Sequence, residues 1–74
     1  MKDLAMPKLN SIECNLISKC LSAIHIPMIQ KEKDKEFVIK ITDAWELMGE
    51  NAPITLKQQS YLRSIAEEQF GAII

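Results

Sequence analysis

The residues that could perform chemistry are few in this chain: two cysteines, one histidine and a pair of adjacent glutamates. Cys14, Cys20 and His25 follow the spacing C-x5-C-x4-H. A zinc site usually takes about four ligands that converge tetrahedrally, with its cysteines in C-x2-4-C pairs. On a helix the two thiols would point about 120° apart around the axis, and no fourth ligand is evident. The spacing therefore predicts two core thiols and a solvated histidine, with no metal and no cofactor.

The same helical spacing argues against a disulfide. Cys14 and Cys20 would lie about 9 Å apart along the helix axis, whereas the Cα atoms of a disulfide lie within about 7 Å of each other. We expect free thiols, with Cys20 buried and unreactive, in a reducing compartment. Residues 1–7 lack the apolar run of a signal peptide, and no stretch approaches the roughly 20 apolar residues of a membrane span. The expected location is therefore the cytoplasm, away from membranes.

Catalysis needs more than these residues supply. His25 is the only histidine, the residue type that ordinarily serves as an acid or base near neutral pH, and no nucleophile or orienting carboxylate is spaced to act with it. Glu67 and Glu68 are neighbours, so on a helix they point about 100° apart. Glycine occurs only at positions 49 and 71, which leaves no Gly-rich phosphate loop. The sequence predicts a protein that is not an enzyme.

Length and charge narrow the classes of function further. The 74 residues allow one small domain, 1–74, with a single compact core. A hydrophobic fraction of 47% and a charged fraction of 26% are ordinary for a globular protein. The net charge is −1, and Lys31, Lys33 and Lys35 alternate with acidic residues. A surface that coats nucleic acid needs a basic excess or cluster, so that class is disfavoured.

The first of three expected helices covers residues 11–24. Asn10 is a good N-cap, and Glu13 three residues later completes a capping box. Pro27 ends the helix, because the residue before a proline avoids helical geometry. The apolar side chains of this helix cover about 200° of its circumference, well beyond the usual stripe of about 100°. Such a helix needs neighbours on more than one side.

The last helix is expected over residues 55–70. Thr55 is its N-cap, and Gln58 completes a second capping box. Gly71 follows the last turn, where a left-handed residue commonly ends a helix. The tail 72–74 is apolar, so we expect it to pack onto the body of the domain or onto a second chain.

The middle of the chain has two interpretations. The helical one covers residues 34–48 and ends at Gly49, and it places six apolar side chains on one stripe about 120° wide: Phe37, Val38, Ile41, Ala44, Trp45 and Met48. The alternative is a β-hairpin within residues 24–42, in which two β-rich runs flank a charged loop. We favour the helix, because one stripe accounts for all six residues. The expected fold class is therefore an all-α, three-helix domain, with an α+β fold as the alternative.

Two of these segments carry a recognisable pattern, Phe37-Val38-x-x-Ile41, then Gly49, then Ile54-Thr55-x-Lys57-Gln58 followed by Leu62 and Ile65. It resembles the F-V-x-x-[IL] helix and the [LI]-[ST]-x-K-Q-x-x-x-L-x-x-[IL] helix of short accessory proteins encoded by phages and plasmids. The likeness covers about half of the chain. The loop 50–53 is longer than in that pattern, and residues 1–30 have no counterpart. The resemblance implies a helical accessory protein of a mobile element, with no common activity or site residue to carry over.

The apolar residues exceed what three short helices can cover, and this surplus leads to the functional hypothesis. In the helical interpretation Ile39 and Leu47 lie on the polar side of the second helix, and Ile73 and Ile74 add an apolar tail. Contiguous apolar surface of this kind marks a contact with another molecule. Glu50 and other acids near the helix ends either suit a basic protein partner or serve solubility, and solubility is the favoured interpretation. We expect an interaction protein, in particular a homodimer, such as an inhibitor or adaptor that binds a host protein; otherwise the first helix is central and the tail covers the rest.

A second hypothesis is a small nucleic-acid-binding accessory protein. Lys57, Gln58 and Arg63 would then read nucleic acid from the polar side of the last helix. Polar helix faces usually carry such residues for solubility, so this stays the alternative to the protein-binding hypothesis.

Overall fold

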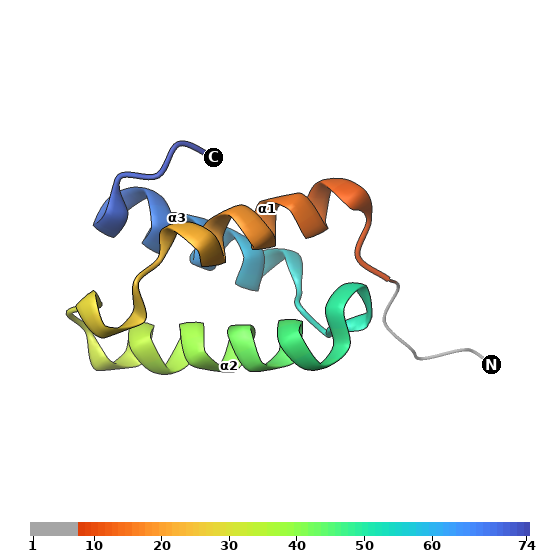
Figure 1. Ribbon diagram of the computed structural model, residues 1–74, viewed down its shortest axis with the longest axis horizontal. Coiled ribbons are helices and arrows are strands. Elements are labelled where there is room, and N and C mark those ends of the chain that lie inside the picture. The colour runs from red at the N-terminus through yellow and green to blue at the C-terminus, as the bar shows by residue number, and fades with distance from the viewer. Residues whose placement is uncertain (1–7) are drawn as a thin grey trace.

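The chain forms three α-helices in the part described by the computed structural model, residues 8–74. They are α1 (Ser11–Ala23), α2 (Glu32–Met48) and α3 (Leu56–Phe70), joined through the short 3-10 turns η1 (Ile26–Met28) and η2 (Gly49–Asn51) (Figure 1). No helix within residues 8–74 is long and apolar enough to cross a membrane. The predicted all-α, three-helix class is confirmed. The expectation about a signal peptide falls on residues 1–7, which lie outside the described residues.

α1 begins with the predicted capping box. The Asn10 side chain accepts a hydrogen bond from the Glu13 backbone N–H (2.8 Å), and the Glu13 carboxylate accepts one from the Asn10 N–H (2.9 Å). These bonds satisfy two backbone donors that a helix start leaves unpaired. The helix ends at Ala23, one residue before the predicted limit, because Ile24 adopts extended backbone (φ −83°, ψ 128°).

α2 settles the choice between helix and hairpin. Residues 8–74 contain no strand, so the β-hairpin alternative over residues 24–42 is wrong. The helix begins at Glu32, two residues before the predicted start, and ends at Met48. Gly49 follows with φ 56°, a left-handed value that glycine adopts readily. Burying one stripe of α2 explains the result, because Val38 and Ile41 on that stripe are almost fully buried.

α3 also begins and ends as its sequence signals predict. Thr55 is the N-cap rather than the first helical residue, and its side chain accepts a hydrogen bond from the Gln58 N–H (3.1 Å). The Gln58 side-chain oxygen accepts one in return from the Thr55 N–H (2.9 Å). Gly71 lies in the left-handed region (φ 66°) after the last turn, where it allows the chain to turn away from the helix axis.

The core is one cluster of buried side chains drawn from all three helices and their connections. α1 and α3 lie close against each other, and α2 runs along the other side of the domain (Figure 1). The segment before α1 also takes part, because the Leu9 side chain is buried and its N–H donates to the Glu50 carbonyl in η2 (2.8 Å). The buried apolar residues are Leu9, Ile17, Cys20, Ile24, Ile29, Val38, Ile41, Ala52, Ile54, Leu62, Ile65 and Ala66. One core of this size supports one domain.

One residue of the predicted apolar stripe lies outside this core. Met48, expected on the buried face of α2, is 47% exposed. It is the last residue of the helix, and the chain turns away at Gly49 directly after it, so no neighbouring element covers its side chain. Phe37, Ala44 and Trp45 of the same stripe are partly buried and pack against the core as expected.

Candidate functional site

The residues singled out for chemistry do not converge. Cys20 is buried, Cys14 is partly buried, and both are free thiols. His25 is exposed in the connection before η1. Burial raises the pKa of the Cys20 thiol above its ordinary value, which favours the protonated, unreactive form. Residues 8–74 contain no group of three or more His, Cys, Asp or Glu side chains that could hold a metal ion.

The two adjacent glutamates of α3 act separately. The Glu67 carboxylate pairs with Arg63 one turn earlier, at 3.0 Å between Nε and Oε2, whereas Glu68 is exposed. An exposed pair at this spacing contributes a few tenths of a kcal/mol. The two carboxylates therefore do not form a joint acid and base.

The predicted interface residues are mostly exposed. Leu47 is 83% exposed, Ile73 is 98% exposed and Ile39 is 42% exposed. Glu50 is exposed in η2, and its carboxylate pairs loosely with Lys8 (3.6 Å). Ile74 differs from the rest, because it is only partly exposed and packs against the core. Of the two final isoleucines, one thus covers the body of the domain and the other projects from it.

Ile74 helps to line a shallow hollow beside α1. The hollow has a volume of about 350 Å³, and α1 contributes Ile12 and Leu16 to its apolar part. Ile12 is 78% exposed, so the apolar surface of α1 continues past the hollow into solvent. The remaining lining residues are polar or basic: Asn15, Lys19 and Arg63.

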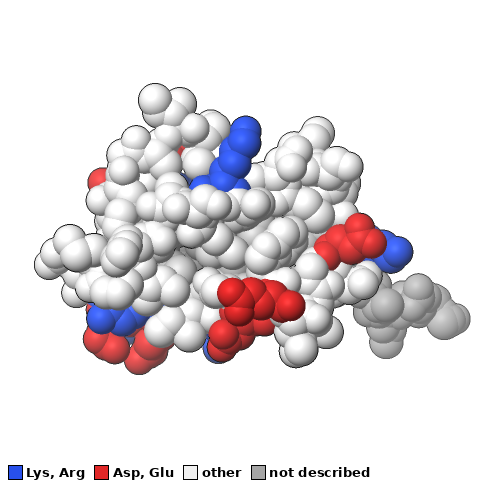
Figure 2. All heavy atoms as spheres, viewed as in Figure 1, with Lys and Arg blue, Asp and Glu red and all other residues white. Residues whose placement is uncertain are grey.

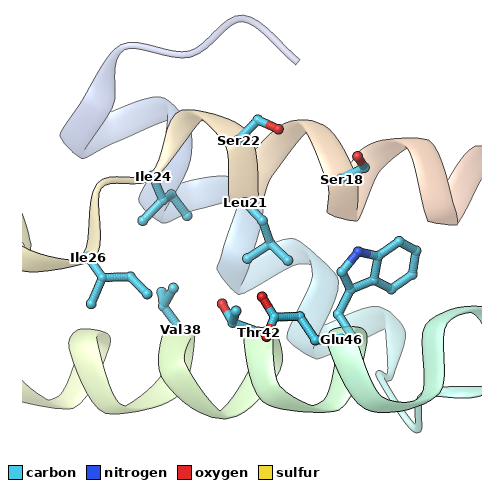
Figure 3. A pocket seen from close by; sticks show the side chains of 9 residues that line it. Ser18, Leu21, Ser22, Ile24, Ile26, Val38, Thr42 and Glu46 are labelled. Carbon is cyan, nitrogen blue, oxygen red and sulfur yellow. The ribbon is translucent and has the colours of Figure 1, made fainter.

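A groove runs between α1 and α2 on the opposite side of α1 from this tail (Figure 3). Its volume is about 260 Å³. Leu21 points from α1 toward α2, where Val38, Thr42 and Glu46 lie, while the hydroxyls of Ser18 and Ser22 point away from α2 (Figure 3). The remaining lining residues are Ile24, Ile26 and Trp45. The groove thus has an apolar floor and a carboxylate at its rim.

The residues of the nucleic-acid hypothesis are already engaged within α3, apart from Lys57. Gln58 is held by the capping box with Thr55, and Arg63 donates to Glu67. Lys57 is exposed. Two of the three residues thus already have hydrogen-bond partners within the domain.

A buried carboxylate, missed in the sequence, links α2 to α3. Asp34 is 6% exposed, and its two oxygens accept hydrogen bonds from the Tyr61 hydroxyl and from Nε2 of Gln69 (2.9 Å). The bond to Asp34 raises the pKa of Tyr61, with burial as a smaller cause. Tyr61 also packs on Phe37, with ring centroids 4.6 Å apart. Asp34 precedes Val38 by one turn and so lies in line with the buried stripe of α2, but its place in an alternating run of charges concealed this position.

A second polar contact joins α1 to α3. Gln59 is buried, and its amide donates to the Glu13 carboxylate (3.2 Å) and to the Ile54 carbonyl (3.2 Å). The backbone N–H of Asn10 and the Gln59 amide both lower the pKa of Glu13. Buried amides are normally hydrogen-bonded in this way, so Gln59 has a structural role.

Comparison with known proteins reveals no relative of this chain. No protein family, no curated protein and no solved structure matches the chain. The function must therefore be inferred from the surface that these helices present.

Proposed function

We propose that this chain is a non-enzymatic protein-interaction module, and that it binds a second copy of itself as well as a partner protein. The observation that carries the proposal is the exposure of large apolar side chains, above all Leu47 (83%) and Ile73 (98%). Large apolar side chains in water cost free energy that a protein contact recovers. An inhibitor or adaptor that binds a host protein would use such a surface, and the sequence resemblance adds only that the chain is similar to accessory proteins of mobile elements.

Two apolar surfaces support the proposal. The first is on α2, where the exposed Ile39 and Leu47 lie about two turns apart with the exposed Asp43 between them. The second combines Ile12 of α1 with Ile74 of the tail, and the exposed Ile73 precedes Ile74 in the chain. Single exposed apolar residues are common on any protein, but Ile12 and Ile74 line one continuous hollow. Contiguous apolar surface is the feature that distinguishes contact sites.

The chemistry of the chain is consistent with a binding role in the cytoplasm. Both cysteines are free, which suits a reducing compartment. No observation favours the nucleic-acid hypothesis, because Gln58 and Arg63 already have partners within α3. We therefore propose no cofactor and no nucleic-acid partner.

The test is the mass of the protein in solution, measured by sedimentation from the low micromolar to the submillimolar range. We expect a monomer–dimer equilibrium. The double variant Leu47→Lys with Ile73→Lys should weaken it at least about tenfold, because an unpaired ammonium group is costly to bury. Circular dichroism should remain unchanged, since both positions are exposed.

Ser60→Lys is the matched control, because it adds a lysine at an exposed position of α3 without removing an apolar side chain. It should leave the dimer constant unchanged. Self-association is contradicted if the chain is monomeric throughout the range. A role for these side chains is contradicted if the control weakens the dimer as much as the double variant does.

A further inference from the structure

The groove between α1 and α2 differs in charge from two other hollows of the described surface. Its only charged lining residue is Glu46. The hollow beside the tail is lined by Lys19 and Arg63, and the one between η1 and the end of α3 by both Lys31 and Glu68. The α1–α2 groove is thus the one of these three hollows whose charge favours a cation. On the face seen in Figure 2, acidic side chains gather over the middle of α2, beside this groove.

The residues of α2 that line the groove form one continuous surface. Thr42 precedes Trp45 by three residues and Glu46 by four, so its side chain neighbours both on the helix, while Trp45 and Glu46 diverge to either side of it. The indole of Trp45 is partly buried, and an indole face attracts cations. Glu46 is exposed and forms no ion pair with any residue of 8–74. Its carboxylate is therefore available to an incoming donor.

The size of the groove restricts what it can hold. Its volume of about 260 Å³ is below the range of about 300–1,000 Å³ typical of sites for cofactors and drug-sized ligands. A single long side chain is a better match. Leu21 and Val38 provide apolar surface for a methylene stem (Figure 3), while Trp45 and Glu46 lie where the charged end would stop.

We propose that this groove is the recognition site for an arginine side chain presented by a protein partner. The proposal rests on the protein-interaction function, and it specifies the side chain that the partner presents. The planar guanidinium can stack on the indole of Trp45 and donate two parallel hydrogen bonds to the carboxylate of Glu46. Its alkyl stem covers Leu21. Arginine is also the charged residue most enriched among the side chains that dominate protein interfaces.

The groove contains its own reporter, because Trp45 is the only tryptophan of the chain. The experiment titrates the full chain with N-acetyl-arginine N-methylamide and follows tryptophan fluorescence, with amide NMR shifts to locate the contact. We expect a saturable change with a dissociation constant on the order of a millimolar, as befits a ligand of this size. The largest shifts should fall at Leu21, Thr42 and Glu46.

Two comparisons test whether binding depends on the positive charge of arginine and on the negative charge of Glu46. The citrulline analogue has nearly the same shape without the charge, and it should bind at least about tenfold more weakly. Glu46→Gln should weaken arginine binding about fivefold or more. Glu36→Gln is the matched control, since Glu36 is an exposed acid of the same helix that does not line the groove, and it should bind the probe as the unmodified chain does.

Equal responses to the arginine and citrulline probes, or unchanged binding by Glu46→Gln, would overturn the assignment. So would a linear, unsaturated response. These outcomes are separable from failure of the proposed self-association, which depends on Leu47 and Ile73 outside the groove. A chain that remains monomeric but binds the arginine probe contradicts only the dimer, whereas one that dimerises without preferring arginine contradicts only the groove.

Discussion

α1 packs closely against α3 but leaves a groove where it faces α2. Toward α3 it presents Cys20, which is buried and lies near Arg63 and Glu67 of that helix. α3 in turn buries Ala66 and Leu62 completely. Toward α2, by contrast, α1 leaves a groove of about 260 Å³. One helix therefore has a closed contact on one side and an open one on the other.

The difference follows from side-chain size and polarity. Small residues such as Cys20 and Ala66 allow two helix backbones to approach closely, and the distance between packed helices depends on such side chains. Trp45 on α2 is larger and Thr42 is polar, and both line the groove. α2 is joined to α3 by side chains, through the hydrogen bonds of Asp34 and the pair of Phe37 and Tyr61.

The largest expected effect is a difference in unfolding free energy between truncations on the two sides of α1. Leu62→Ala should lower the free energy of unfolding by about 2–5 kcal/mol, because Leu62 is fully buried and its truncation leaves a cavity. Leu21→Ala, in the groove, should cost only about 1 kcal/mol, since part of that side chain already faces water. Urea denaturation followed by circular dichroism measures both. Equal losses would mean that the groove is packed as tightly as the α1–α3 contact.

The attachment of α2 to α3 can be weakened through Asp34. Asp34→Asn replaces one accepting carboxylate oxygen with an amide nitrogen that carries hydrogens. This nitrogen then faces either the Tyr61 hydroxyl or the Gln69 amide, both of which donate to Asp34. We therefore expect a loss of about 1–3 kcal/mol in unfolding free energy. Glu36→Gln makes the same kind of change at an exposed position of α2 and should have almost no effect. If Asp34→Asn is as stable as the unmodified chain, the polar contact is not what secures α2.

The smallest expected effect is the loss of stability at alkaline pH, where the Tyr61 hydroxyl loses its proton. The hydrogen bond to Asp34 raises the pKa of Tyr61 above its ordinary value of 10.0. The folded chain therefore keeps this proton at a pH where the unfolded chain has lost it. This contribution to stability is complete below pH 10 and is lost as the pH rises through the folded-state pKa.

Tyr61 is the only tyrosine, so the ultraviolet absorbance of tyrosinate reports its titration directly. We expect a midpoint above that of a tyrosine peptide, and Asp34→Asn should return it toward the peptide value. A midpoint that does not respond to Asp34→Asn would show that the two side chains are not bonded in solution.

Local signals were sufficient to predict the three helices. Asn10 with Glu13 and Thr55 with Gln58 marked two helix starts, because a capping box needs only residues three positions apart. Gly49 and Gly71 marked the ends for the same reason. The choice between helix and hairpin for the middle segment was harder, since β-branched residues such as Val38 and Ile41 favour strands in isolation. Burial of a single stripe decided in favour of the helix.

What the sequence could not give were the contacts between helices. Asp34 stands within an alternating run of lysines and acids, where it resembles solvated charge, and its partners Tyr61 and Gln69 are far away in the chain. The groove likewise combines residues of α1 and α2 whose spacing depends on how closely the helices approach. Exposure of Leu47 and Ile39 was predictable, because each lies off the apolar stripe of α2. The partial cover of Ile74 was not, because it depends on where the tail turns after Gly71.

The bond between Leu9 and η2 has a mechanical consequence. The chain just before α1 is fastened to the carbonyl of Glu50, and thus to the turn that connects α2 with α3. Opening that turn would require Leu9 to leave the core together with its hydrogen bond. Movement at the connection between the second and third helices is therefore coupled to the start of α1, because a swing of α2 away from α3 at this end would strain the hydrogen bond of Leu9 as well.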